Sequence, residues 1–103
     1  MTGTIAADRL ISADLGAVEL ALDGASLALT NLRSAEVGLW EMAPGTDTDT
    51  EADEVFLVLA GTGSVEFADG SVLRLRPGTL VRLHAGDRTT WRVTERLRKL
   101  YLM

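Results

Sequence analysis

Short runs of apolar residues, interrupted by turn residues about every eight to ten positions, fill the chain from Ala35 onward. This rhythm predicts β-strands, because successive side chains of a strand point to opposite faces. Residues 55–60 are apolar throughout, which is typical of a central strand covered on both faces. The expected strands cover residues 36–43, 54–60, 63–68, 71–76, 79–84, 89–94 and 97–102.

Glycine-containing turns connect several of these strands. The sequences GTG at 61–63 and DG at 69–70 offer the positive φ angles that short hairpin loops need, and PG at 77–78 favours another turn. We therefore expect a hairpin at each of the first two positions.

The first 34 residues show a weaker pattern. Residues 5–15 fit a short helix, whereas residues 17–22 and 26–30 fit strands. A chain of 103 residues suits one domain, since independent domains usually need about 100–150 residues each. We expect one all-β domain in which residues 1–34 pack on a barrel formed by residues 35–103.

Composition agrees with a packed domain, at 47% hydrophobic and 24% charged residues. No apolar run reaches the roughly 18 residues of a membrane-spanning helix, and the first ten residues lack the basic and apolar regions of a signal peptide. We expect a cytoplasmic protein that does not bind membranes. The absence of cysteine excludes disulfides, thiolate catalysis, sulfur-ligated zinc and iron–sulfur sites.

Charge is distributed unevenly along the chain, whose net charge is -5. Residues 1–69 hold 13 acids against two arginines, whereas residues 70–103 hold eight bases against two acids. We expect strands of the two halves to pair and to set acids beside bases. We expect no nucleic-acid partner, because the basic half lacks interleaved aromatic residues and a known binding motif.

Two stretches, 37–61 and 75–101, contain short motifs at a characteristic spacing. They are VGLWE at 37–41, APG at 43–45, Glu54, VLAG at 58–61, LRPG at 75–78, LHAG at 83–86, TWRVTE at 90–95 and RKLY at 98–101. This combination resembles the cupin superfamily, in the branch typified by ureidoglycine aminohydrolase and ethanolamine-utilisation cupins. The resemblance implies a double-stranded β-helix, a jelly-roll-like antiparallel barrel with a pocket at one mouth, commonly a homodimer.

The same resemblance implies a metal site of three histidines and one glutamate. Only Glu54 is in place, and spacing puts the histidine positions on Thr48, Thr50 and Thr89. A threonine hydroxyl is a poor ligand for transition metals compared with imidazole. We therefore expect no cofactor and no metal, with Glu54 as the ligand if a weakly held divalent cation binds. The single histidine, His84, is expected at the barrel rim, and a place in the pocket is the alternative.

Residues 47–54 place five carboxylates within eight positions. They begin like a calcium loop, but Ala52 and Val58 stand where such a loop needs glycine and glutamate. We expect a solvated acidic loop that faces water or the arginines of the second half. A carboxylate site for a hard divalent cation around Glu54 is the alternative.

Glu54 is the candidate catalytic residue, because its family counterpart points into the barrel, where a carboxylate needs hydrogen-bond donors. We expect Arg82, Arg92, Tyr101 or threonine hydroxyls as those donors. Glu54 then acts as a general acid or base, or it is a structural carboxylate locked by an arginine. The predicted ligand pocket comprises Thr48, Thr50, Glu54, Thr89, Trp91 and Tyr101.

These features predict a cupin-fold protein that binds a small polar metabolite at the barrel mouth. Two alternatives stay open. One is a metal-dependent enzyme of the ureidoglycine aminohydrolase type that uses Glu54 and nearby carboxylates. The other is a non-catalytic accessory or dimerisation domain whose pocket is filled by side chains. The fold does not choose among them, since one fold hosts many functions.

Overall fold

The computed structural model describes residues 9–20 and 25–103, and the regular structure of this part is almost entirely β-strand. One short 3-10 helix, η1 (Leu15–Ala17), precedes the strands. The strands are β1 (Ser26–Leu32), β2 (Ala35–Met42), β3 (Gly45–Thr50), β4 (Glu54–Phe67), β5 (Val72–Leu75), β6 (Leu80–Leu83) and β7 (Arg88–Leu102).

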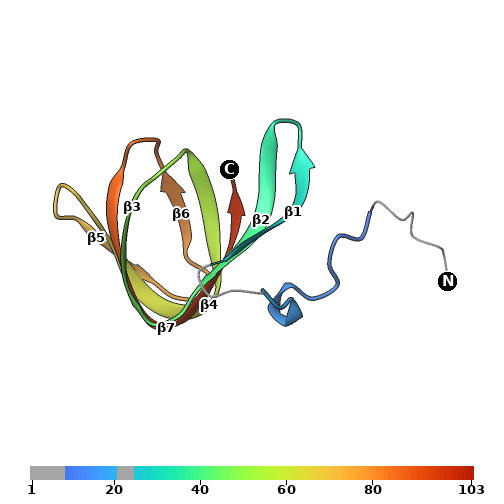
Figure 1. Cartoon of the computed structure of the whole chain (residues 1–103), viewed down its shortest axis with the longest axis horizontal. Coiled ribbons are helices and arrows are strands. Elements are labelled where there is room, and N and C mark those ends of the chain that lie inside the picture. The colour runs from blue at the N-terminus through green and yellow to red at the C-terminus, as the bar shows by residue number, and fades with distance from the viewer. Residues whose placement is uncertain (1–8, 21–24) are drawn as a thin grey trace.

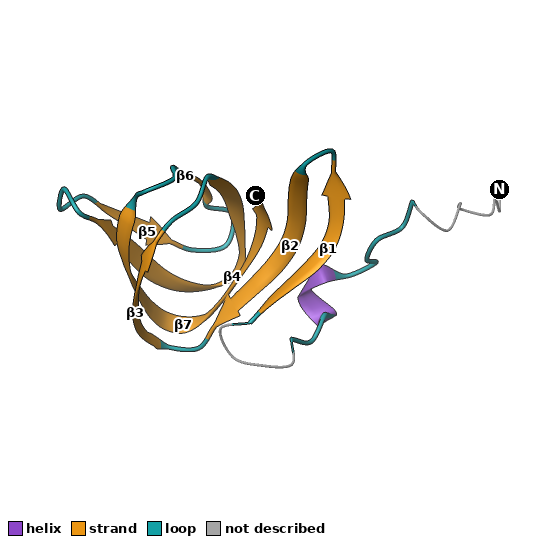
Figure 2. Ribbon diagram, turned by 45° about the horizontal axis from the view of Figure 1, so that its top comes forward, coloured by secondary structure: helices purple, strands orange, loops and turns teal. Residues whose placement is uncertain are grey.

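The strands form one antiparallel sheet that curls into a barrel (Figures 1 and 2). The main path of the sheet is β1-β2-β7-β4-β5, with β3 also paired to β7 and β6 to β4. The β1-β2 hairpin stands beside the curled sheet, on the right in Figure 1. The expected all-β, jelly-roll-like antiparallel barrel is confirmed.

The two longest strands, β4 and β7, are each continuous where the sequence pattern predicts two strands. A hairpin at 61–63 is a wrong prediction, because β4 bends there through register shifts and does not reverse. Gly61 has a φ of 87°, and a Cβ on it would lie 2.0 Å from the carbonyl oxygen of Arg96. Gly61, which resembles a turn residue in the sequence, is therefore required because β7 leaves no room for a side chain at this position. β7 likewise joins the predicted strands 89–94 and 97–102.

The described residues of the N-terminal segment differ from expectation. Residues 9–14 are not helical and residues 18–20 are not in a strand, while residues 5–8 and 21–22 of these predicted elements lie outside the described part. The helix η1 is capped by Asp14, whose side chain accepts a hydrogen bond from Gly16 N–H at 2.9 Å. The strand predicted at 26–30 is confirmed as β1 and continues to Leu32.

Odd-numbered positions of β7 other than Glu95 are buried, so this strand supplies much of the core. Even-numbered positions at the start of β4 are buried as well. The buried cluster consists of Phe56, Val58, Val65, Leu75, Val81, Leu83, Trp91, Val93, Leu97 and Tyr101.

Ion pairs join the acidic and basic halves of the chain, as the charge distribution predicts. Arg92 lies 2.8 Å from Glu66, and both Arg96 and Arg98 reach Glu41. Burial raises the pKa of Glu41, but the hydrogen bonds from Arg98 and Arg96 outweigh burial and hold that pKa below its ordinary value.

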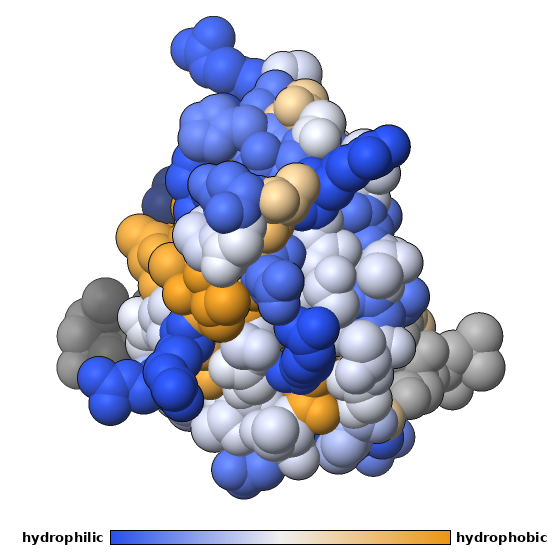
Figure 3. Space-filling view, turned by 90° about the vertical axis from the view of Figure 1, so that its left-hand side faces the viewer, coloured by the Kyte–Doolittle hydropathy of each residue, from blue (hydrophilic) through white to orange (hydrophobic). Residues whose placement is uncertain are grey.

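The surface carries a few exposed apolar side chains at the edge of the sheet. Figure 3 faces the end of the barrel with β5 and shows a small hydrophobic group among polar side chains. In β5 and β6, the exposed large apolar residues are Val72, Leu73 and Leu80. None of the described helices is long and apolar enough to cross a membrane.

Tyr101 ties the end of β7 to β2. A Cβ on Gly38 would lie 2.4 Å from the Tyr101 ring, so only glycine leaves room for it. The Tyr101 hydroxyl donates a 2.6 Å hydrogen bond to Glu36 Oε2. Burial and the neighbouring Glu36 carboxylate raise the pKa of Tyr101 to about 12.

Gly61 has both a positive φ and a close neighbour, and a second glycine allows the two effects on stability to be measured separately. Gly70 has a similar φ of 88°, but a Cβ there would meet nothing within 4 Å. We expect Gly70→Ala to cost about 1 kcal/mol of unfolding free energy through its positive φ alone. Gly61→Ala should cost about 1–3 kcal/mol more through overpacking against β7. Equal losses for the two variants in urea unfolding would contradict this role of Gly61.

Tyr101 is the only tyrosine in the chain, so its ionisation can be followed by ultraviolet absorbance. We expect a midpoint near pH 12 while circular dichroism still reports the folded barrel. Because the folded pKa exceeds the unfolded value of about 10, the stability gained is present below pH 10 and is lost as the pH rises through 12. Glu36→Gln should lower the midpoint, whereas Glu95→Gln should not. A midpoint near 10 in the folded protein would contradict the burial of this hydroxyl.

Candidate functional site

A cavity of about 240 Å3 opens at one mouth of the barrel. Strands β1, β2, β3 and β7 and the beginning of β4 supply its walls. The lining residues are Ser26, Trp40, Met42, Asp47, Thr48, Asp49, Glu51, Glu54, Trp91, Lys99, Tyr101 and Met103.

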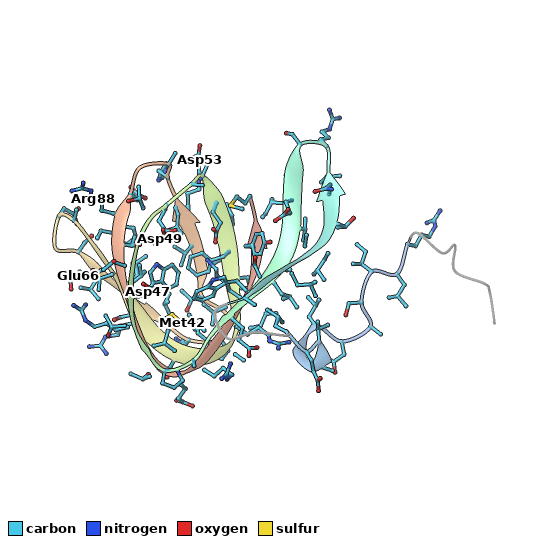
Figure 4. All side chains as sticks on the ribbon, in the orientation of Figure 1. Met42, Asp47, Asp49, Asp53, Glu66 and Arg88 are labelled. Carbon is cyan, nitrogen blue, oxygen red and sulfur yellow. The ribbon has the colours of Figure 1, made fainter. Side chains whose placement is uncertain are left out.

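Residues 45–50, most of them expected in a loop, form strand β3 on the side of this cavity. The alternation of threonine and aspartate in this strand lacks apolar residues, so its period-two pattern is not visible as a hydrophobic signal. Asp47 pairs with Trp91 and Asp49 with Thr89 on β7. Cross-strand partners share a face, so these two aspartates lie on the inward face of β3 (Figure 4). The prediction of a loop is wrong here, although the strand is exposed.

Glu54, at the start of β4, forms a buried ion pair with Lys99 of β7. Lys99 Nζ donates to Glu54 Oε2 at 2.6 Å, and the two side chains are 6% and 10% exposed. The same ammonium lies 4.8, 4.4 and 4.8 Å from the ring centroids of Trp40, Phe56 and Trp91. Aromatic faces attract cations, so the carboxylate and the three rings together hold a positive charge at the floor of the cavity.

The donor to Glu54 is therefore not among those expected from the sequence. Arg82 pairs with Asp53 at 3.2 Å, and Arg92 pairs with Glu66. Both arginine side chains are about half exposed. Trp91 and Lys99 are eight positions apart, so one continuous strand puts both on the inward face. The sequence pattern predicts two strands, 89–94 and 97–102, and therefore does not place Lys99 inside.

A second buried carboxylate, that of Glu51, was not predicted as a site residue. Its side chain accepts hydrogen bonds at Oε2 from Thr89 Oγ1 at 2.6 Å and from Trp91 Nε1 at 2.9 Å. Its backbone is held as well, since its N–H donates to Asp87 O and its carbonyl accepts from Gly86 N–H, both at 2.8 Å. Residue 51 is 9% exposed and fixed from both sides.

Each of the two buried glutamates uses one carboxylate oxygen in these bonds. Among the described residues, no donor reaches Oε1 of Glu51 or Oε1 of Glu54. No fully buried side-chain nitrogen or oxygen of this part of the chain lacks a partner. Both Oε1 atoms therefore keep some accessible surface, and both residues line the cavity.

The predicted pocket residues are only partly brought together. Thr89 lies beside Glu51 and acts through its hydrogen bond to that carboxylate. Thr50 borders a separate surface hollow together with Arg88. The predicted residues that border the cavity are Thr48, Glu54, Trp91 and Tyr101.

The lone histidine lies outside the cavity. The His84 side chain is 66% exposed, and its Nδ1 is 4.0 Å from Asp87 Oδ2 in the turn between β6 and β7. Within residues 9–20 and 25–103, no three histidine, aspartate or glutamate side chains come together in a way that could hold a metal ion.

Comparisons with solved structures give relatives of this barrel. A protein of unknown function from Rhizobium leguminosarum bv. viciae 3841 is 32% identical, with a TM-score of 0.70 over 76% of this chain and 77% of the other. A DUF861 family protein from Thermotoga maritima is 30% identical, with a TM-score of 0.58 over 61% and 73%. The EutQ protein of Clostridium difficile is 26% identical, with a TM-score of 0.65 over 75% and 64%.

The sequence itself identifies the family. No protein of curated function matches the chain. Residues 29–101 match the family model of the EutQ-like cupin domain, a segment that contains β2 to β6 and most of β7. It therefore includes Glu51, Glu54 and Lys99. The chain belongs to the EutQ-like cupin domain family, in the small-cupin branch that its motifs indicate.

Proposed function

We propose that this cupin binds a small polar molecule in the barrel-mouth cavity, and that it does so without a metal. The observation that carries the proposal is a cavity bordered by aromatic rings and by two glutamates, each with a carboxylate oxygen that no donor among the described residues reaches. Ligand pockets combine such apolar walls with a few convergent polar groups. The volume of about 240 Å3 lies just below the roughly 300–1,000 Å3 of pockets for drug-sized molecules, which favours a small metabolite.

The residues present do not fit the divalent metal that the cupin resemblance implies. Glu54 already has a cationic partner in Lys99. The Thr89 hydroxyl donates a hydrogen bond to Glu51 and not to Glu54, so these groups do not converge on one metal position. We propose that the ammonium of Lys99 supplies the positive charge that a metal ion would otherwise supply beside this carboxylate.

The two alternative functions have less support. A metal-dependent enzyme of the ureidoglycine aminohydrolase type needs several ligands around one point, and Glu54 instead faces a lysine. An accessory domain with a filled pocket does not agree with an open cavity. A cytoplasmic location and a homodimer belong to the proposal as well, although the cavity argument requires neither.

The buried ion pair can be tested by a double-mutant cycle. Lys99→Met leaves the Glu54 carboxylate uncompensated, and we expect a loss of about 3–5 kcal/mol in unfolding free energy. Glu54→Gln combined with Lys99→Met should recover much of that loss, since no buried charge is then left alone. Additive losses in urea unfolding would contradict the pairing. A divalent metal content near one per chain, in wild-type protein purified without chelator or metal-affinity resin, would contradict the proposal that the site works without a metal.

Ligand binding can be tested by thermal denaturation with a panel of small amines, carboxylic acids and ureides at millimolar concentration. A compound that occupies the cavity should stabilise the protein by about 1–3 kcal/mol once its concentration is well above its Kd. Ser26→Phe should abolish the effect, because residue 26 borders the cavity. Ala28→Phe, on the same strand but away from the lining, is the matched control. No stabilisation by any compound, or equal stabilisation of both variants, would contradict binding in this cavity.

A further inference from the structure

We infer that the ligand is a small organic cation with N–H donors, a primary ammonium or an amidinium, and that Glu51 is the residue that recognises it. This inference rests on the binding function proposed above and adds the chemical class of the ligand. It depends on three observations about the lining residues: their net negative charge, the predominance of hydrogen-bond acceptors over donors, and the two tryptophan side chains among them.

The titratable groups of the lining carry an excess of negative charge. Among the lining residues that the structure describes, four are carboxylates (Asp47, Asp49, Glu51 and Glu54) and one, Lys99, is basic. Lys99 is paired with Glu54, so the other three carboxylates have no basic partner within the lining. A concave surface with one sign of charge concentrates ligands of the opposite sign. An anionic ligand would have to approach these carboxylates.

The available hydrogen-bonding groups are mainly acceptors. Glu51 lines the cavity and is about nine-tenths buried, and no donor among the described residues reaches its Oε1. Asp47 and Asp49 each use Oδ1 to accept the N–H of the following residue at 2.8 Å, which leaves Oδ2 of each available. Acceptor oxygens need a ligand that donates, and an ammonium offers three N–H donors and no acceptor. A charge-assisted bond of this kind is about twice as strong as a neutral one.

The walls of the cavity already hold one ammonium group. Lys99 Nζ lies within 4.8 Å of the ring centroids of both Trp40 and Trp91, and both tryptophans line the cavity. The two rings are 5.5 Å apart at an angle of 50°. These tilted indoles offer apolar surface to the organic part of a cation. The combination of acidic rim and aromatic wall therefore selects organic cations over hydrated metal ions.

Trp91 provides a direct reporter for the inference, because its indole N–H donates to the same carboxylate that we assign to the ligand. A ligand on Glu51 Oε1 draws electron density from the shared carboxylate and shifts the Trp91 indole signal. Trp40, the other tryptophan, lines the same cavity but makes no hydrogen bond to Glu51 in the described part of the chain, so a shift confined to Trp91 reports on that carboxylate.

The experiment titrates the whole protein with four probes that share one ring: benzylammonium, benzyltrimethylammonium, benzyl alcohol and benzoate. We expect benzylammonium to shift the Trp91 indole signal and to bind at least ten-fold more tightly than benzyl alcohol. Benzyltrimethylammonium has the charge without N–H donors and should bind several-fold more weakly than benzylammonium. Benzoate should bind most weakly of all.

Matched variants locate the interaction. Glu51→Gln keeps an acceptor for Trp91 and removes the charge, and it should weaken benzylammonium binding at least five-fold. Glu95→Gln makes the same chemical change on an exposed residue outside the lining and should leave the affinity unchanged. If Glu51→Gln fails to fold, Asp47→Asn on the exposed strand β3 should weaken binding in the same direction.

The outcomes separate this inference from the function on which it rests. Tighter binding of benzoate or benzyl alcohol, equal binding of the two cations, or an unchanged affinity in Glu51→Gln would overturn the inference while leaving a binding cavity. If no probe of any charge shifts the Trp91 signal, and no compound in the thermal panel binds, the binding function itself is overturned.

Discussion

A carboxylate and an ammonium 2.6 Å apart, enclosed by three aromatic rings, set the chemistry of this barrel interior. Removing two charges from water costs several kcal/mol per ion, and attraction offsets that cost only when the geometry is good. Here the ring faces add a favourable surface for the cation. The site around the pair must accordingly be built from elements that position Glu54, Lys99 and the rings together.

Strand β7 meets that requirement, because it runs past three other strands of the barrel. It pairs with β2, β3 and β4, and its inward positions deliver Thr89, Trp91, Lys99 and Tyr101 to one side. Lys99 lies opposite Trp40 on β2 and Val58 on β4. Because β7 is continuous, the positions of Thr89 and Trp91 are fixed relative to those of Lys99 and Tyr101. The close passage over Gly61 is part of the same requirement, since it keeps β4 and β7 in contact where both strands bend.

The all-β barrel and its family could be predicted from the sequence, because turn spacing, period-two apolar runs and motif spacing all depend on local residue choice. Strand β3 could not, since a threonine–aspartate alternation carries no hydrophobic contrast. The hairpin expected at 61–63 was misleading because glycine serves close backbone approach as readily as a turn. Around the cavity, the sequence predicts Thr48, Glu54, Trp91 and Tyr101 but neither Glu51 nor Lys99. Charged residues are seldom buried, and only the assembled register places these two inside.

The positive charge beside Glu54 comes from a side chain of the protein itself, Lys99. A metal ion must be captured from solution, and its occupancy depends on supply, competing ligands and chelators. A lysine side chain is present at fixed stoichiometry as soon as its strand is made, and it cannot be exchanged for another ion. The positive charge of this ammonium is therefore inherited with the sequence.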